Sequence, residues 1–331
     1  MGELSRRQER LREALSAARA KDVDEGVGRG ADGEPAEKAK GRKPSAVPVA
    51  DPDATIQPNK EGGFAPNYTP LATVDGTIGM IVDGEVLADH DEASQTVATV
   101  DRVEETFGAR PTQLLADSAY GSGVNLAGLA ERGVEAYIPV EQRADGAENP
   151  APRADPTQAV AESEWAKLPR DARSKKLDRS AFVYDGSADC YYCPLGHRLD
   201  FVREQDKQRR NGGGVYRLYR CGNCVGCRLA EACVKSKTGL RTIGRDQHEP
   251  LREAMAAKLK TEAGRAAYGR RRWIAETPFG TIKGAMGIRQ FLLRGLEKVK
   301  IEWDWVCTAF NLKKLLRAVG SLRARLAGLM A

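Results

Sequence analysis

The sequence has no run of 18 apolar residues, which excludes a membrane-spanning helix of ordinary length. Its N-terminus is charged and lacks the apolar segment of a secretory signal peptide. Hydrophobic residues make up 41% of the chain and charged residues 30%, a balance typical of a folded core beside a disordered portion. The net charge of +6 favours an anionic partner. We expect a cytoplasmic protein, whose seven cysteines are more typical of metal ligands than of disulfides.

Large apolar residues are almost missing between Lys21 and about Lys60, where Gly, Ala, Pro, Asp and Lys dominate. Such a segment cannot bury enough surface to offset its chain entropy, so we predict a disordered linker. Before it, residues 3–20 have the apolar spacing of a helix.

The remaining sequence alternates between strand and helix patterns. Residues 68–75 and 77–87 are apolar and β-branched and are separated by Asp75-Gly76, which predicts a β-hairpin. The later expected elements are a helix at 92–106, a strand at 113–116, a helix at 121–133, a strand at 134–140, and helical segments at 250–272 and 295–328. Residues 141–180 are polar and indicate a loop or an inserted segment. A hairpin followed by alternating strands and helices predicts a mixed α/β sheet.

Six cysteines form a block between residues 190 and 233. Cys190-x2-Cys193 is followed by Cys221-x2-Cys224-x2-Cys227-x5-Cys233. Two Cys-x2-Cys pairs can place four thiolates round one structural Zn²⁺, and we name Cys190, Cys193, Cys221 and Cys224 as its ligands. Because six cysteines exceed one site, Cys227 and Cys233 compete for the same role and His197 is a further candidate. The alternative is a set of free thiols or a redox pair.

Asp117 follows the short apolar strand at 113–116 and precedes small residues. That position exposes a carboxylate at the carboxyl edge of a sheet, where α/β proteins place their sites. The alternative is that Asp117 or Ser118 caps the following helix.

Glu276 is the single acidic residue before the end of the basic stretch Gly269–Leu296. Arg272, Glu276 and Lys283 have the spacing Arg-x3-Glu-x6-Lys, and Arg289 and Arg294 follow. A carboxylate among cations suits a metal ligand beside a phosphodiester backbone. The alternative is a basic surface helix with an incidental Glu. Pro278 either separates two helices, with Thr277 as N-cap, or kinks a single one.

From about Asp51 to Leu316 the chain resembles the C-terminal part of a DDE-type insertion-sequence transposase. The matching pieces are DPDATIQPNKEGGFAPNYTPLATVD, LLADSAYGSGVNLAGLAERGVEAYIP, CPLGHRL and ETPFGTIKGAMGIRQFLLRGLEKVKIEW, in that order. The resemblance implies an RNase H-like fold in which two Asp and one Glu hold two Mg²⁺ ions for in-line attack on a phosphodiester. Asp117 corresponds to the second Asp and Glu276 to the Glu. Arg272 and Lys283 match the family's Tyr-x2-Arg-x3-Glu-x6-Lys signature, which contacts DNA, although Tyr268 lies one residue early.

The family's first Asp has no counterpart in the expected place. It ends a strand that comes before the hairpin, whereas Asp51 and Asp53 lie in a different segment and Asp75 lies in the hairpin turn. We therefore expect an N-terminally truncated copy that lacks the DNA-binding region and the first strand. Two carboxylates hold two Mg²⁺ ions poorly, so we expect little activity from this chain alone. Asp75 is the leading substitute for the first Asp.

The predicted organisation has four parts: a helix and disordered linker at 1–50, the first part of an RNase H-like core at 51–140, an insertion with a zinc-ribbon-like cysteine block at 141–245, and the C-terminal helical part of the core at 246–331. The implied partners are double-stranded DNA at transposon ends and a second copy of the chain, with no membrane. Two other functions stay open: a zinc-stabilised DNA-binding protein without catalysis, and a zinc-stabilised hydrolase with another substrate.

Overall fold

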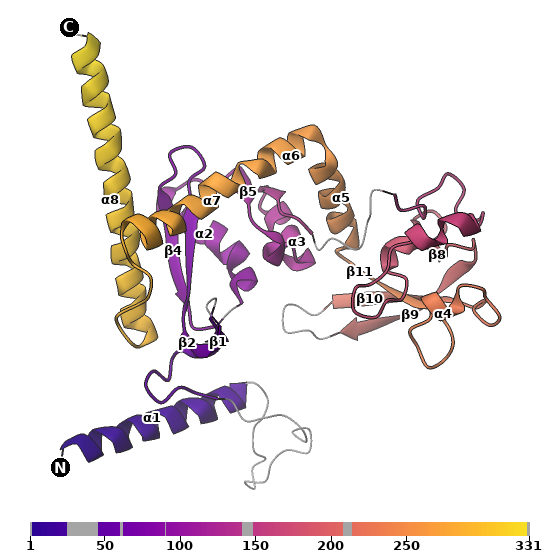
Figure 1. Ribbon diagram of the computed structural model, residues 1–331, viewed down its shortest axis with the longest axis horizontal. Coiled ribbons are helices and arrows are strands. Elements are labelled where there is room, and N and C mark those ends of the chain that lie inside the picture. The colour runs from indigo at the N-terminus through magenta and orange to yellow at the C-terminus, as the bar shows by residue number, and fades with distance from the viewer. Residues whose placement is uncertain are drawn as a thin grey trace. The chain divides into compact units, whose positions relative to one another are not determined.

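The chain forms two compact units, which are described here one at a time (Figure 1). The computed structural model describes residues 2–24, 46–59, 62–89, 91–140, 148–207 and 214–329. The first unit comprises Met1–Pro111 and Gly269–Ala331, and the second comprises Thr112–Tyr268.

The first unit combines short strands with helices from both ends of the chain. Its elements are α1 (Gly2–Asp24), β1 (Thr55–Pro58), β2 (Phe64–Asn67), β3 (Thr69–Val74), β4 (Ile81–Leu87), the 3₁₀ helix η2 (Glu92–Gln95), α2 (Thr96–Phe107), α7 (Arg271–Gly280), the π-helical turn η6 (Thr281–Ala285) and α8 (Leu296–Leu329). β1 pairs with β2 and β3 with β4, both antiparallel.

The β3–β4 hairpin packs against α8, which runs alongside it in Figure 1. Trp303, Val306 and Phe310 of α8 are buried with Ile81 and Val86 of β4. The indole of Trp303 donates a hydrogen bond to the carbonyl of Leu71 at 2.8 Å. This hairpin was predicted from Asp75-Gly76 and its flanking residues. Its turn is longer than two residues, because Asp75 N–H donates to the Met80 carbonyl at 2.9 Å.

The predicted linker ends earlier than expected. Residues 25–45 lie outside the part of the chain that the structure describes. Disorder up to about Lys60 is wrong for residues 51–58, since Thr55–Pro58 forms β1. Asp51 Oδ1 accepts a hydrogen bond from the Tyr68 hydroxyl at 2.8 Å, and Asp53 Oδ2 accepts one from Leu296 N–H at 3.0 Å. These contacts fix the segment to the beginning of α8, where unpaired helical N–H groups favour carboxylates.

α7 continues through Pro278, so a single helix is found rather than a break capped by Thr277. Proline has no N–H to donate to the preceding turn. The Thr277 hydroxyl instead donates to the carbonyl of Trp273. After Gly280 the helix widens into η6, a π-helical turn of the kind that often marks functional sites.

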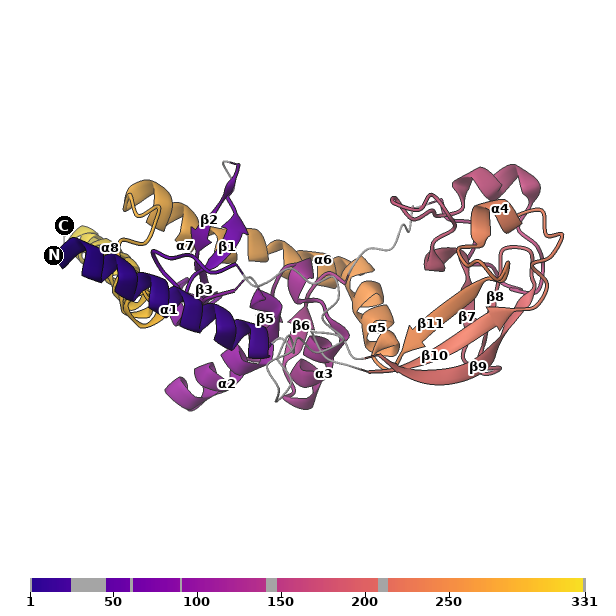
Figure 2. The ribbon, with the colours of Figure 1, turned by 90° about the horizontal axis from the view of Figure 1, so that it is seen from below.

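The second unit contains a parallel strand pair and a larger antiparallel sheet. Its elements are β5 (Gln113–Leu115), η3 (Ser118–Tyr120), α3 (Gly123–Glu131), β6 (Glu135–Tyr137), η4 (Glu162–Lys167), η5 (Arg179–Ala181), β7 (Val183–Asp185), β8 (Cys190–Tyr192), β9 (Arg198–Lys207), β10 (Gly214–Cys221), α4 (Ala230–Cys233), β11 (Thr242–Asp246), α5 (Glu249–Lys260) and α6 (Glu262–Gly269). β5 and β6 are parallel, with α3 between them in sequence. β7 to β11 form a five-stranded sheet in the order β11-β10-β9-β8-β7 (Figure 2).

The segment at 141–180, predicted to be a loop or an inserted segment, is largely irregular over its described residues 148–180, and these residues also help to form the core of the cysteine-containing part. Leu168 and Leu177 are buried with Tyr191, Leu199 and Tyr219 of the sheet. The sequence pattern did not predict this role, because the apolar residues are sparse. A buried Leu every nine or so positions produces neither a helix period nor a strand period.

The prediction of a mixed α/β fold is confirmed. Hydrogen bonds join the described strands into four separate sheets, and β3–β4 and β5–β6 are two distinct pairs. Among the described residues, no helix is long and apolar enough to cross a membrane.

Candidate functional site

Asp117 lies two residues after the end of β5, with Ala116 between, and is partly exposed. One carboxylate oxygen accepts a hydrogen bond from Ala119 N–H at 3.0 Å and caps η3. α3 has its own cap, because the Ser122 hydroxyl accepts from Asn125 N–H at 3.2 Å. Asp117 therefore caps a short turn, as the structural alternative predicted, and also lies at the carboxyl end of a strand.

Glu276 lies on the exposed side of α7. Ile274 and Pro278 of the same helix are buried, and Ile274 lies 3.5 Å from the position of a Cβ built on Gly76 in the hairpin turn. Because each residue turns an α-helix by about 100°, Glu276 projects away from the side that Ile274 buries. Its side chain is 61% exposed and forms a long ion pair with Arg271 at 3.9 Å.

The four cations predicted to bind DNA, Arg272, Lys283, Arg289 and Arg294, are all exposed. Arg272 lies one turn before Glu276, and Lys283 lies about two turns after it on the same side. Arg289 and Arg294 lie in the loop between η6 and α8. Within the described chain none of the four has an ion-pair partner, so each cation is available to an external anion.

Asp75 uses its carboxylate to shape the hairpin turn. Its Oδ1 accepts from Thr77 N–H at 2.9 Å and from Ile78 N–H at 2.7 Å. Asp51 and Asp53 are likewise engaged at the beginning of α8. Each of these three aspartates thus has a local structural role in the first unit.

Asp117 belongs to the second unit and Glu276 to the first, so each is placed only within its own unit. Both are carboxylates that reach solvent, and Mg²⁺ prefers oxygen ligands of this kind, so the donor chemistry fits. Among the described residues no three His, Cys, Asp or Glu side chains are arranged as a metal site.

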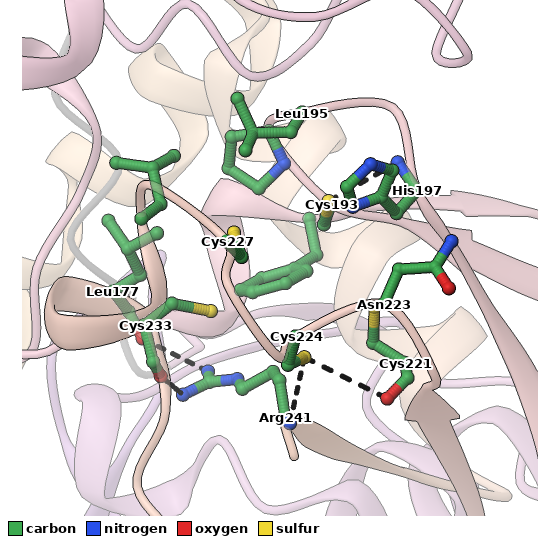
Figure 3. A pocket seen from close by; sticks show the side chains of 13 residues that line it. Leu177, Cys193, Leu195, His197, Cys221, Asn223, Cys224, Cys227, Cys233 and Arg241 are labelled. Atoms are coloured by element: carbon green, nitrogen blue, oxygen red, sulfur yellow. Dashed lines mark hydrogen bonds between the residues drawn. The ribbon is translucent and has the colours of Figure 1, made fainter. Parts of the chain in front are cut away.

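The cysteine block surrounds one pocket in the second unit (Figure 3). Cys193, Cys221, Cys224, Cys227 and Cys233 line it, together with His197 and Arg241. Cys190 is fully buried but is not part of this lining; its thiol is hydrogen-bonded with Tyr192 and lies near Arg198. All seven cysteines are free, and Cys307 lies in the first unit.

Burial raises the pKa of the Cys221 thiol and of the Cys233 thiol, each to about 12. Near Cys233 the Arg241 guanidinium acts in the opposite direction on that pKa. The Arg241 side chain is only 5% exposed, and burial lowers its own pKa. The pocket therefore combines thiols with a buried cation.

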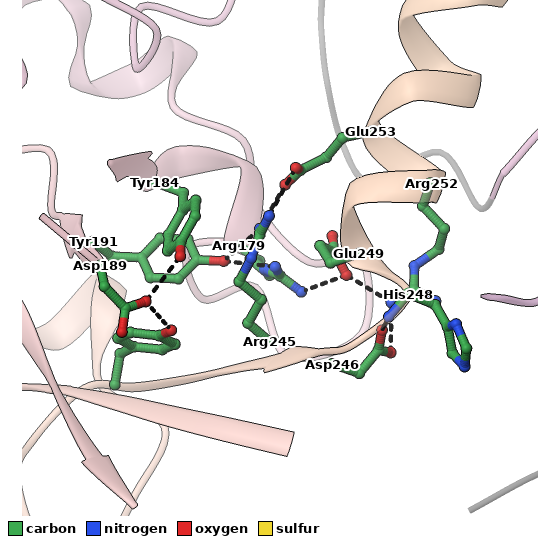
Figure 4. Close-up of polar contacts among 11 residues, drawn as sticks. Arg179, Tyr184, Asp189, Tyr191, Arg245, Asp246, His248, Glu249, Arg252 and Glu253 are labelled. Atoms are coloured by element: carbon green, nitrogen blue, oxygen red, sulfur yellow. Dashed lines mark hydrogen bonds and ion pairs between the residues drawn. The ribbon is translucent and has the colours of Figure 1, made fainter. Parts of the chain in front are cut away.

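A buried ionic network joins the five-stranded sheet to α5 (Figure 4). Glu249 is 1% exposed and binds Arg179 at 3.0 Å and Arg252 at 2.7 Å. Arg252 also binds Asp246 at the end of β11. Sequence reasoning missed this network, because Arg and Glu at the beginning of a helix are normally exposed.

α5 also lies against the helix that follows Asp117. A Cβ built on Gly123 of α3 would come within 2.3 Å of the His248 side chain. Glycine is therefore required where the two helices approach closely. Through α5, the cysteine-containing sheet supports the region of Asp117 within the second unit.

Residues 192–316 match the family model described as the transposase DDE domain. The matched stretch includes Glu276, the four cations and five of the six cysteines of the block, whereas Asp117 and Cys190 precede it. The match supports a resemblance of this stretch to the C-terminal part of a DDE-type transposase, and the mixed α/β fold fits such a domain. Comparison with curated proteins and with solved structures finds no match.

Proposed function

We propose that this protein catalyses metal-dependent cleavage and transfer of DNA strands at the ends of an insertion sequence. The observation that carries the proposal is the family match over a stretch in which Glu276 stands exposed between Arg272 and Lys283 on one side of a helix. Divalent metal ions such as Mg²⁺ are general in this family.

In this proposal Asp117 and Glu276 are ligands of Mg²⁺ in an RNase H-like core. Bound Mg²⁺ would activate a water or a DNA 3′-OH and neutralise charge on the phosphodiester. Asp117 supplies its carboxylate from a capped turn, which restricts the side chain. Arg272, Lys283, Arg289 and Arg294 hold the DNA backbone near Glu276.

The alternative function is that of a DNA-binding protein without catalysis, which uses the same cations but needs neither carboxylate. Binding of metal that depends on both Asp117 and Glu276 separates the two functions. A DNA substrate and free cysteines both agree with the proposed cytoplasmic location.

We also propose a homodimer formed through α8. One side of this helix is buried by Trp303, Val306 and Phe310, and a second apolar side is exposed. The exposed apolar residues are Ile301, Trp305, Leu312, Leu315 and Val319; with Thr308 as the one polar position they are spaced alternately by four and three, and this spacing continues in sequence to Leu322, Leu326 and Leu329. This is the heptad spacing of a coiled coil.

Charge along α8 favours an antiparallel second copy as the occupant of this apolar side. Glu302 and Asp304 flank the heptad positions near its beginning, whereas Arg323 and Arg325 occupy the equivalent positions near its end. Antiparallel pairing places acidic residues of one copy beside basic residues of the other, and parallel pairing does not.

Metal-directed cleavage of the protein tests the active-site proposal without requiring DNA cleavage. Fe²⁺ bound at a Mg²⁺ site generates hydroxyl radicals with ascorbate and peroxide, which cut the backbone nearby. We expect cuts near residue 117 and near residue 276 that added Mg²⁺ suppresses. Glu276→Gln should abolish both cuts, because the two side chains share the ion.

Two control variants match the test residues in local structure. Asp155 is exposed and accepts from Thr157 N–H at 2.9 Å in the same kind of turn as Asp117, and Glu262 is an exposed carboxylate on α6. Asp155→Asn and Glu262→Gln should leave the cutting pattern unchanged. Cuts confined to one of the two sites, or insensitive to Asp117→Asn, would refute a shared metal site.

A further inference from the structure

The pocket of the cysteine block is built from three separate segments. Cys193 follows β8, Cys224 and Cys227 lie in the loop after β10, and Cys233 ends α4. Figure 3 shows their side chains placed round the same pocket, with Arg241 beside them. Soft thiolate ligands in sets of four are typical of structural Zn²⁺ sites.

We propose that Cys193, Cys224, Cys227 and Cys233 bind one structural Zn²⁺, with Arg241 as the buried counter-cation of the site. This ligand set replaces Cys190 and Cys221 of the sequence-based assignment with Cys227 and Cys233. The proposal does not depend on catalysis by Asp117 and Glu276.

Arg241 supplies an independent reason to place negative charge in this pocket. Its guanidinium donates to the carbonyls of Cys233 at 2.8 Å and Leu177 at 3.0 Å, and it stacks 4.9 Å from the ring centre of Phe182. Its Nε is buried without a hydrogen-bond partner, and Asp178 and Asp171, the carboxylates whose charges act on it, form no ion pair with it. A buried unpaired cation is costly. Zn²⁺ with four thiolates carries a net charge of about −2 and would offset that cost.

Backbone groups are already directed at two of the proposed ligand sulfurs. His197 N–H donates to Cys193 Sγ at 3.3 Å, and Arg241 N–H donates to Cys224 Sγ at 3.4 Å. Such donors favour the thiolate over the thiol. Gly226 has a φ of 72°, which lets the chain turn sharply between Cys224 and Cys227.

The remaining two cysteines have other surroundings. Cys190 lies outside the pocket lining, on the opposite face of β8 from Tyr191, which is packed in the core. Cys221 ends β10 and also lines the pocket, where its side chain is hydrogen-bonded with Cys224, so it is the alternative ligand that the variants below distinguish.

Zinc binding requires the side chains to turn toward one point. Among the described residues the cysteines are not arranged at ligand positions, which for tetrahedral Zn²⁺ means sulfurs about 3.8 Å apart, from Zn–S bonds of about 2.3 Å. A cysteine sulfur moves between staggered positions by rotation about χ1 alone, without a change in the backbone. His197, whose Nδ1 is also buried without a partner, is the alternative fourth ligand.

Zinc content and Co²⁺ spectra of the full chain test this ligand set. Purified protein should contain about one zinc per chain, and Co²⁺ in its place should give the intense sulfur-to-metal charge transfer and visible bands of four thiolates. Cys227→Ala should reduce the zinc content to near zero. Cys227→His should retain metal but shift the visible bands to those of three sulfurs and one nitrogen. Cys227 is the most informative position because it is the only one of the four proposed ligands that is not buried.

Cys190→Ala and Cys221→Ala are the matched controls, and both should keep the zinc content and the Co²⁺ spectrum of the parent protein. Loss of metal in these two variants, with retention in Cys227→Ala, would overturn the ligand set in favour of the paired knuckles. Bands of three sulfurs and one nitrogen in the parent would assign His197 instead of one cysteine. Parent protein that folds, as judged by circular dichroism, but takes up neither metal would overturn the site altogether.

Discussion

Asn311 forms both backbone hydrogen bonds of Ile81. Its amide oxygen accepts from the Ile81 N–H and its amide nitrogen donates to the Ile81 carbonyl, each at 2.8 Å, across 230 positions of sequence. Ile81 begins β4, so one side chain of α8 completes the hydrogen bonding at this end of the hairpin. The helix and the hairpin are therefore joined by polar as well as apolar contacts.

Asn311→Ala should destabilise the first unit by about 1–3 kcal/mol, because it leaves a partly buried donor and acceptor unsatisfied. The denaturant midpoint, followed by tryptophan fluorescence, measures the change. Arg317→Ala, at an exposed position on the same helix away from the apolar side proposed for the dimer, is the control and should shift the midpoint little. Equal shifts in the two variants would contradict this role of Asn311.

The second prediction concerns the buried network of the second unit. Glu249→Ala leaves Arg179 and Arg252 without their common carboxylate, and breaking a buried ion pair in this way costs about 3–5 kcal/mol. Glu162→Ala removes a surface pair with Arg228, of the same 2.7 Å length as the Glu249–Arg252 contact, and should cost about 0–1 kcal/mol. Urea unfolding of both variants, followed by circular dichroism, compares them directly. A smaller loss in Glu249→Ala than in Glu162→Ala would contradict the network's importance.

These contacts show where sequence reasoning succeeds and where it stops. The hairpin was predicted because Asp75-Gly76 and β-branched residues act locally, and Asp75 does shape the turn. The helix at 295–328 was predicted because one apolar side repeats along it, and α8 is found there. Local patterns of this kind are encoded within a few residues.

Pairs that are distant in sequence could not be predicted in this way. Nothing near Asn311 indicates Ile81 as its partner, and nothing near Arg241 indicates burial among thiols. The cysteine spacing likewise predicted a metal-binding block but left open which cysteines meet, since that depends on how β8, β10 and α4 pack. The sequence therefore predicts the chemistry of the site better than it predicts which residues form it.

Stability of the first unit should decrease as the pH rises above about 10. Burial, and then the hydrogen bond to Asp51, raises the pKa of Tyr68 above its ordinary value of 10.0. Above pH 10.0 the hydroxyl of Tyr68 is therefore still protonated in the folded state, whereas it loses its proton in the unfolded state. A rise in pH above 10.0 consequently favours the unfolded state. Between pH 9 and 11 the urea midpoint of Tyr68→Phe should fall less than that of the parent protein. An unchanged slope would exclude Tyr68 as its cause.

The fourth prediction is that the exposed cations around Glu276 dominate DNA affinity. Each phosphate contact contributes about 0.9 to the slope of log affinity against log salt concentration. Replacing Arg272, Lys283, Arg289 and Arg294 by Gln should therefore lower the slope by up to about 3.6. Binding of a duplex measured by fluorescence anisotropy at several salt concentrations gives this slope.

The control for DNA binding changes the same number of charges elsewhere. Arg203, Arg220, Lys235 and Lys237 are exposed cations of the cysteine-containing part. Their replacement by Gln should change the slope much less. If both quadruple variants lose the same slope, DNA contacts are spread over the basic surface and are not concentrated near Glu276.

The last prediction is that α8 mediates self-association. Leu312→Glu places a charge at the centre of the exposed apolar side and should convert a dimer into a monomer in sedimentation velocity experiments. Arg317→Glu lies on the same helix away from that side and should leave the dimer intact.

Charge reversal then tests the orientation. Asp304→Arg alone and Arg325→Asp alone should each weaken the dimer, since each places like charges together in an antiparallel pair. The double variant should restore association, because both pairs become complementary again. A parallel coiled coil would show no such restoration, since residues 304 and 325 then lie at different heights along the two helices. A chain that stays monomeric at all concentrations would refute the homodimer itself.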